Sequence, residues 1–295
     1  MKVAVAQFAA ALGDLEANAR RHLDLIEEAR AAGVRCLLFP EMSLTGHSGG
    51  RRTLALALDD RHPIVARIAK AAGPMAVTFG AIEEGPAAQF HNTAFTVEGD
   101  RVVHVHRKIN LATYGGLEDG KHFAAGRYVE TFALEGRWRA ASLICNDLWN
   151  PALVHLAALH GATLLLAPVS SAREAVGAEF DNPSGWATAC RYSAMVYGMP
   201  LMFANRTGQE GGDAGTSRDG RLTFWGGSRI VDAFGNTLAA MDEEDGIAVA
   251  ELDYEQVRRA RYLLPTVRDS NLDLLAREVE RLRTIVGVPE RVREP

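Results

Sequence analysis

The chain has 295 residues, of which 47% are hydrophobic and 23% are charged. This composition is typical of a globular protein and excludes a disordered or fibrous chain. The net charge of −5 is small and no basic stripe is present, which argues against nucleic acid as a partner. No apolar run approaches the roughly 18 residues that a membrane span requires, so we expect no membrane association through such a span.

The cysteines and the first residues indicate the cellular compartment. Cys36, Cys145 and Cys190 are widely spaced and form no C-x-x-C pair, so we expect neither a disulfide framework nor a zinc site. The opening sequence MKVAVAQF is typical of a strand and lacks the features of a signal peptide. We therefore expect a cytoplasmic protein.

Strand and helix patterns alternate through the first half of the chain. A β-rich run covers residues 2–8, and Asp14 can cap a helix that ends at Gly33. Residues 34–39 form a continuous apolar run, as in a strand buried on both faces. The next predicted elements are a helix at 63–72, a strand at 75–83 and a hairpin of strands 91–97 and 101–107.

The second half continues the alternation. The predicted elements are a hairpin at 128–134 and 137–144, a helix at 151–160, a strand at 163–167, a helix at 185–197, strands at 201–204, 227–231, 238–241 and 247–252, and an amphipathic helix at 271–283. Hairpins together with buried parallel-type strands predict an α/β fold with two sheets. We expect one domain over residues 1–295, with 254–295 as a helical extension. Long irregular stretches at 111–127 and 207–226 indicate functional loops.

Three polar residues follow apolar strands far apart in the sequence. Glu41 follows CLLFP, Lys108 follows VVHVHR, and Cys145 follows ASLI. If these strand ends converge, Glu41 can act as general base and Cys145 as nucleophile. Lys108 can hold an oxyanion and favour the thiolate by its charge. Each residue also has a purely structural interpretation: a small core residue for Cys145, a helix start for Glu41 and a basic turn for Lys108.

The sequence around these residues resembles the carbon–nitrogen hydrolase, or nitrilase-like, superfamily over most of the chain. FPE places that family's base at Glu41, HRKINLATYGGLEDGKHFAAG places its lysine at Lys108, and SLICNDLWNP places its nucleophile at Cys145. PLMFANRTG and LTFWGGS match later family segments. The resemblance implies a four-layer α-β-β-α sandwich that works without a cofactor.

The resemblance also implies further site residues. A second acidic residue follows the lysine: the register points to Asp119, whereas residue type and reach favour Glu118, which we prefer. The family uses the backbone N–H at the position of Asn146 in its oxyanion hole. The residues expected to bind substrate are Tyr114, Asn146, Trp149, Ser170 and Trp225. Trp186 and Phe224 are further aromatic candidates in these segments, as compatible with packing as with binding.

Other patterns carry less information. His104 and His106 are spaced as neighbours on one strand face, but no third ligand lies nearby, and we expect no metal. The absence of an HExxH motif argues against zinc peptidases, and we expect no serine hydrolase. Asp147 and Asn150 are candidates to begin the helix that follows the nucleophile.

The segments CNDLW, ATYGGLEDGKHF and TFWGGS are most similar to the glutaminase-type amidase domain of NAD synthetase. No ATP-binding synthetase segment follows, so we expect hydrolysis alone. We predict an amidase that cleaves a non-peptide amide or carbamoyl C–N bond of a small molecule through a Cys145 thioester, releasing ammonia or an amine. The alternatives are a nitrilase using the same residues, an acyltransferase, and a non-catalytic interaction protein.

The apolar residues within 272–286 predict a homodimer or larger homo-oligomer.

Overall fold

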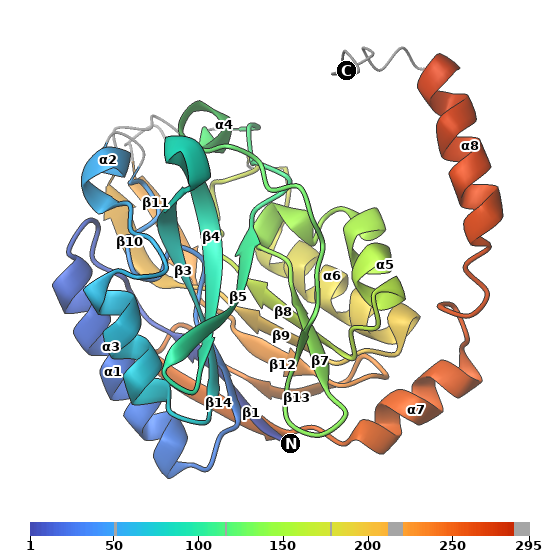
Figure 1. Ribbon diagram of the computed structural model, residues 1–295, viewed down its shortest axis with the longest axis horizontal. Helices are drawn as coiled ribbons and strands as arrows, with labels where there is room; N and C mark the ends of the chain where they lie inside the picture. The colour runs from blue at the N-terminus through green and yellow to red at the C-terminus, as the bar shows by residue number, and fades with distance from the viewer. Residues whose placement is uncertain (50–51, 116, 178, 212–220, 286–295) are drawn as a thin grey trace.

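A computed structural model describes residues 1–49, 52–115, 117–177, 179–211 and 221–285. Two six-stranded sheets pack face to face, and helices cover their outer faces (Figure 1). The expected four-layer α-β-β-α sandwich is therefore confirmed.

The first sheet has the strand order β14-β1-β2-β3-β4-β5. The pairs β1–β2 and β2–β3 are parallel, whereas β3–β4, β4–β5 and β1–β14 are antiparallel. The strands are β1 (Lys2–Gln7), β2 (Cys36–Leu38), β3 (Ala76–Gly85), β4 (Gln89–Glu98), β5 (Arg101–Arg107) and β14 (Gly246–Glu251). The predicted hairpin at 91–107 is confirmed as β4–β5.

The second sheet has the order β13-β12-β9-β8-β7-β6, with β7, β8 and β9 parallel. Its strands are β6 (Phe132–Ala133), β7 (Arg139–Ser142), β8 (Leu164–Pro168), β9 (Leu201–Ala204), β12 (Arg229–Val231) and β13 (Thr237–Ala240). The hairpin expected at 128–144 is much shorter than predicted, since β6 and β7 pair over two residues each.

The stretch at 207–226, expected to be irregular, contains a separate antiparallel pair. Its strands are β10 (Thr207–Gly211) and β11 (Arg221–Trp225). Leu222 and Phe224 of β11 are buried against Ala172 and Ala175, which provides the apolar contact that stabilises this hairpin.

The helices are α1 (Leu15–Ala31), α2 (Thr53–Leu56), α3 (Pro63–Ala72), α4 (Asp119–His122), α5 (Pro151–Leu159), α6 (Asn182–Tyr197), α7 (Tyr254–Leu263) and α8 (Leu272–Ile285). Asp14 caps α1 as predicted, accepting a hydrogen bond from the Ala17 N–H at 2.9 Å. Helix α6 begins before the predicted residue 185, because Asp181 caps it and a proline occupies its first turn.

Alternation along β1 explains the layers. Val3 and Val5 face the second sheet and join the core between the sheets, whereas Ala4 and Ala6 face the core under α1 and α3. Strand β8 alternates in the same way between the central core and the core under α5 and α6. Since successive side chains of a strand point to opposite faces, both sheets are buried on both sides.

The C-terminal helices differ in their packing. Val257 and Ala260 attach α7 to the central core. No side chain of α8 is buried, and this helix extends away from the sandwich (Figure 1). Val286, the end of the segment predicted to mediate association, lies outside the described residues. Within the described ranges, no helix has the length and apolar character needed to cross a membrane.

Candidate active site

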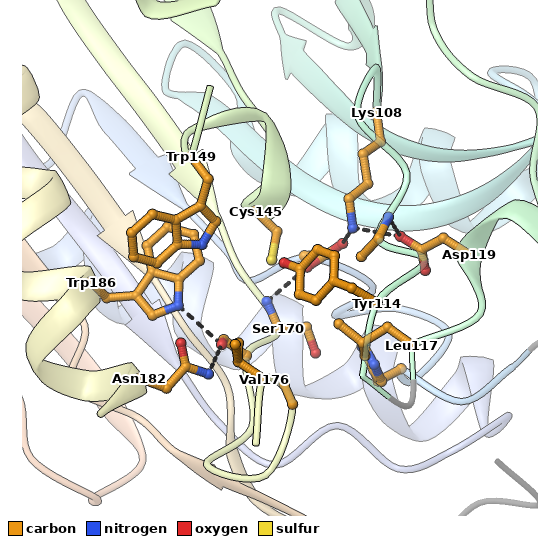
Figure 2. Close-up of a pocket in the computed structure, with 15 residues that line it drawn as sticks. Lys108, Tyr114, Leu117, Asp119, Cys145, Trp149, Ser170, Val176, Asn182 and Trp186 are labelled. Atoms are coloured by element: carbon orange, nitrogen blue, oxygen red, sulfur yellow. Dashed lines mark hydrogen bonds and ion pairs between the residues drawn. The ribbon is translucent and has the colours of Figure 1, made fainter. Parts of the chain in front are cut away.

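The ends of four strands meet at one pocket. Glu41 follows β2, Lys108 follows β5, Cys145 follows β7 and Ser170 follows β8, and all four side chains line the same cavity. Figure 2 shows Lys108, Cys145 and Ser170 around this space. The structure thus brings together the carboxylate, the ammonium and the thiol that the sequence analysis singled out.

A buried ammonium lies between two carboxylates. Lys108 Nζ is 2.8 Å from Glu41 Oε1 and 2.7 Å from Asp119 Oδ2, and its side chain is only 2% exposed. Burial by itself lowers the pKa of Lys108, but the Asp119 and Glu41 carboxylates outweigh burial and hold this pKa well above its usual value. Burial likewise opposes ionisation of Asp119, yet Lys108 brings the pKa of that carboxyl below its ordinary value. The lysine is therefore charged at neutral pH.

The Glu41 carboxylate is held by further donors. Asn92 Nδ2 donates to Oε1 at 2.7 Å, and the Ser170 backbone N–H donates to Oε2 at 2.8 Å. The backbone oxygen of Asn92 also accepts from the Lys108 N–H at 2.8 Å. Sequence analysis missed Asn92, although a buried amide within a predicted strand signals a specific partner.

The second acidic residue in contact with the lysine is Asp119. Its Oδ2 also accepts a hydrogen bond from the Ala112 N–H at 3.1 Å. The preferred residue, Glu118, is not brought to this cluster, because its carboxylate points outward and accepts from Lys121 Nζ at 2.5 Å. Asp119 is the first residue of the short helix α4, and its side chain contacts Lys108. The register of the family resemblance therefore indicated which acidic residue contacts the lysine, whereas the longer side chain of a glutamate did not.

Cys145 stands in a tight turn between β7 and α5. Its φ of +45° lies in the left-handed region that side chains other than glycine rarely adopt. Desolvation and the nearby Glu41 carboxylate raise the pKa of the thiol well above its usual value, and Lys108 offsets this only in part. Lys108 thus favours the thiolate by its charge, as expected, but not enough to outweigh burial and Glu41. The resting thiol is neutral and needs a base.

The Asp147 carboxylate links the lysine segment to the cysteine turn. Oδ1 accepts from the backbone N–H groups of Ile109 at 3.0 Å and Asn110 at 2.7 Å. Oδ2 accepts from the Ile144 N–H at 3.1 Å and contacts His106 Nε2 at 3.0 Å. Asp147 therefore joins two segments instead of beginning a helix.

The structure also assigns the neighbouring polar residues. Asn150 caps α5, accepting a hydrogen bond from the Ala152 N–H at 3.0 Å. The two histidines that share a strand face have separate partners. His106 contacts Asp147, and the His104 ring stacks on Phe132 with centroids 4.7 Å apart.

Three of the five residues expected to bind substrate line the pocket: Tyr114, Trp149 and Ser170. Asn146 lies beside it and accepts a hydrogen bond from the Tyr114 hydroxyl at 3.0 Å. Trp225 does not line this pocket, because its indole is buried in the core under α5 and α6. A tryptophan on a strand packs in the core or lines a pocket according to the face of the sheet to which its side chain points. This short segment does not reveal that face.

The remaining wall of the pocket was only partly anticipated. Trp186, an aromatic candidate, lines it, and its ring centroid lies 4.6 Å from that of Trp149. His47 and Asn182 also line it and were missed. Burial lowers the pKa of His47, so its imidazole is neutral at pH 7. Phe224 instead lies beneath the Arg206 guanidinium, 4.3 Å from its ring centroid.

Comparisons with known proteins agree with this geometry. The profile of the family described as "Carbon-nitrogen hydrolase" matches residues 2–262. The chain is 27% identical over 274 residues to a glutamine-dependent NAD(+) synthetase from Thermotoga maritima, covering 91% of this chain and 45% of that protein. It therefore spans slightly less than half the length of that relative.

Two amidases match over almost their whole length. An (R)-stereoselective amidase from Pseudomonas sp. is 26% identical over 287 residues, covering 95% of each chain. The solved structure of an amidase from Nesterenkonia sp. AN1 superposes with a TM-score of 0.74 at 25% identity, covering 90% of this chain and 98% of that one.

Adjacent acidic residues provide a matched test of the second carboxylate. We expect Asp119→Asn to lower turnover at least about tenfold, equivalent to ~1.4 kcal/mol of activation free energy, because Lys108 loses one of its two anionic partners. Glu118→Gln should keep near-normal turnover. Steady-state kinetics of both variants checks this, and a larger loss in Glu118→Gln would reverse the assignment.

We expect Asp147→Asn to lower kcat far more than it changes KM, because the amide cannot make all four contacts that join the lysine segment to the cysteine turn. Asp232→Asn is the control, since Asp232 is another buried carboxylate that accepts backbone N–H groups, in the turn after β12. Kinetics and thermal melts of both variants should show comparable destabilisation but loss of kcat in Asp147→Asn alone. Equal kcat values would contradict a positioning role.

Proposed function

The chain belongs to the carbon–nitrogen hydrolase family, and on that basis we propose that it hydrolyses an amide or carbamoyl C–N bond of a small molecule through a thioester on Cys145. The observation that carries the proposal is one pocket lined by the Cys145 thiol, the Glu41 carboxylate and the Lys108 ammonium. The pocket combines these polar groups with the aromatic side chains of Tyr114, Trp149 and Trp186, a lining that suits a small organic substrate. The two amidases among the similar proteins support the same class of reaction.

In the first step, Glu41 accepts the thiol proton while the sulfur attacks the carbonyl carbon. The raised pKa of the thiol makes a base necessary, and Glu41 is the carboxylate fixed in place beside it. In a glutamate-to-glutamine mutant of the Nesterenkonia amidase, acrylamide has undergone Michael addition at the active site cysteine, which supports sulfur as the attacking atom.

The oxyanion that develops is stabilised by the Lys108 ammonium and by the backbone N–H of Asn146. Lys108 is already desolvated and fixed between two carboxylates, so little reorganisation is needed when negative charge appears. The C–N bond then breaks, Glu41 returns its proton to the leaving nitrogen, and ammonia or an amine departs. The acyl group remains on sulfur as a thioester.

A water molecule completes the cycle. Glu41, again unprotonated, accepts a proton from that water as its oxygen attacks the thioester carbon. The C–S bond breaks, the carboxylic acid leaves, and the sulfur takes back the proton. Each turnover thus consumes one water and restores the thiol.

The central experiment measures ammonia release from short amides, N-carbamoyl amines, glutamine and nitriles. We expect release from amides or carbamoyl compounds, and none in Cys145→Ala, because the nucleophilic sulfur is gone. Release from nitriles alone would favour a nitrilase. An inactive wild type whose Cys145 reacts with iodoacetamide no faster than the fully buried Cys36 and Cys190 would favour a non-catalytic protein.

Lys108 provides a test of the oxyanion step. Loss of one such donor typically lowers turnover by about 10²–10³. We expect Lys108→Arg to be nearly as damaging as Lys108→Ala, because a planar guanidinium cannot occupy the point between two carboxylates that a compact ammonium fills. Steady-state kinetics of the two variants tests this expectation. Wild-type turnover in Lys108→Arg would exclude a role for Lys108 in stabilising the oxyanion.

We also propose the organisation of the protein in the cell. Residues 1–295 would form a single domain, with 254–295 as its helical extension. The three cysteines are unpaired, which fits a reducing compartment, and we propose the cytoplasm. The apolar side of α8 would mediate assembly into a homodimer or larger homo-oligomer.

Association through α8 can be tested directly. Its exposed apolar side chains include Leu272, Leu275, Val279 and Leu282, whose spacing places them along one face. We expect light scattering at micromolar concentration to give at least a dimeric mass, and Leu275→Glu with Leu282→Glu to lower that mass without changing the thermal stability of the monomer. Arg277→Ala in the same helix is the control. A monomeric wild type would refute the proposal.

A further inference from the structure

Asn182 is a buried amide on the wall of the candidate active site. It is the first residue of α6, its side chain is 1% exposed, and it lines the same pocket as Cys145. Figure 2 shows it close to Trp186 and Val176, on the side of the pocket away from Lys108 and Asp119. It lies apart from the groups that carry out the proposed chemistry.

The orientation of this amide is fixed by its nitrogen. Asn182 Nδ2 donates to the Ala172 carbonyl oxygen at 2.7 Å and to Ser171 Oγ at 2.9 Å. A carbonyl oxygen can only accept, so the atom that faces it must be the nitrogen. Trp186 Nε1 donates to the same Ser171 Oγ at 3.0 Å, which ties the amide to the aromatic wall.

The side-chain oxygen is left as an acceptor. Asn182 Oδ1 is buried and has no hydrogen-bond partner among the described residues. A buried acceptor that stays unpaired costs roughly 1–3 kcal/mol, so such an atom on a pocket wall is suited to a donor supplied by the ligand. The other residues that line this side of the pocket include the apolar side chains of Trp149, Trp186 and Val176.

The charges of the pocket restrict the donor further. The charged side chains that line it in the described part of the chain are the Glu41 and Asp119 carboxylates and the Lys108 ammonium, while His47 is neutral. Their sum is one negative charge. This favours an ammonium over a carboxylate on the substrate, because an additional anion would be repelled.

We infer that Asn182 is a specificity-determining residue whose Oδ1 accepts a hydrogen bond from an amino or hydroxyl group on the acyl side of the substrate. The inference rests on the proposed amide hydrolysis and narrows its substrate class to amides that carry such a donor. A site built around a buried acceptor rejects an alkyl analogue, since the acceptor is then left unpaired.

The test uses matched substrate pairs in which an ammonium replaces a methyl group. The pairs are glycinamide with propionamide, 3-aminopropionamide with butyramide, and 4-aminobutyramide with pentanamide. We expect wild-type kcat/KM to favour the amino member of at least one pair about tenfold or more. Asn182→Ala should reduce that ratio to about one.

The ratio separates recognition from general damage. Asn205→Ala is the matched control, because Asn205 also holds Ser171, accepting from its N–H at 2.9 Å, but does not line the pocket. This variant should lower both members of a pair equally. Hydrolysis of both members with a ratio near one in the wild type, or an unchanged ratio in Asn182→Ala, overturns the inference alone. Failure to release ammonia from any amide, N-carbamoyl amine or glutamine overturns the proposed function.

Discussion

The contact on which the site depends is the buried ammonium of Lys108 between two carboxylates. Desolvating any one of these three charges alone would be strongly unfavourable, and each is tolerated because an opposite charge lies within 2.8 Å of it. The contact also joins parts of the chain that are far apart: the residue after β5, the segment after β2, and the start of α4. The two ion pairs therefore form only because the strand order brings these three segments together at the pocket.

Burial, and after it the charge of this cluster, keeps the Cys145 thiol protonated at rest. Two carboxylates and one ammonium leave a net negative charge beside Cys145, which disfavours a second anion on sulfur. The lysine is thus better suited to an oxyanion that forms during reaction than to a thiolate at rest. A carboxylate that raises the pKa of the thiol is also the group placed to remove its proton, so both effects follow from the same position of Glu41.

Much of this arrangement could be predicted from the sequence. Alternating patterns identified most strands and both sheets, and the positions after the apolar strands placed Glu41, Lys108 and Cys145 at one pocket. The contributions of Asn92, Asp147 and Asn182 could not be predicted, because each depends on partners that only the tertiary fold brings near. The choice between Glu118 and Asp119 turned on where a four-residue helix begins, a local detail that residue type does not determine.

The left-handed backbone at Cys145 has a consequence for the side chain at this position. Glycine adopts a φ of +45° without the steric penalty that a β-carbon brings, so the residue that best suits this turn is one that carries no sulfur. Folding stability and reactivity therefore favour different side chains at the same position. Replacement of Cys145 by glycine would therefore relieve this backbone strain and at the same time remove the thiol that the proposed reaction needs.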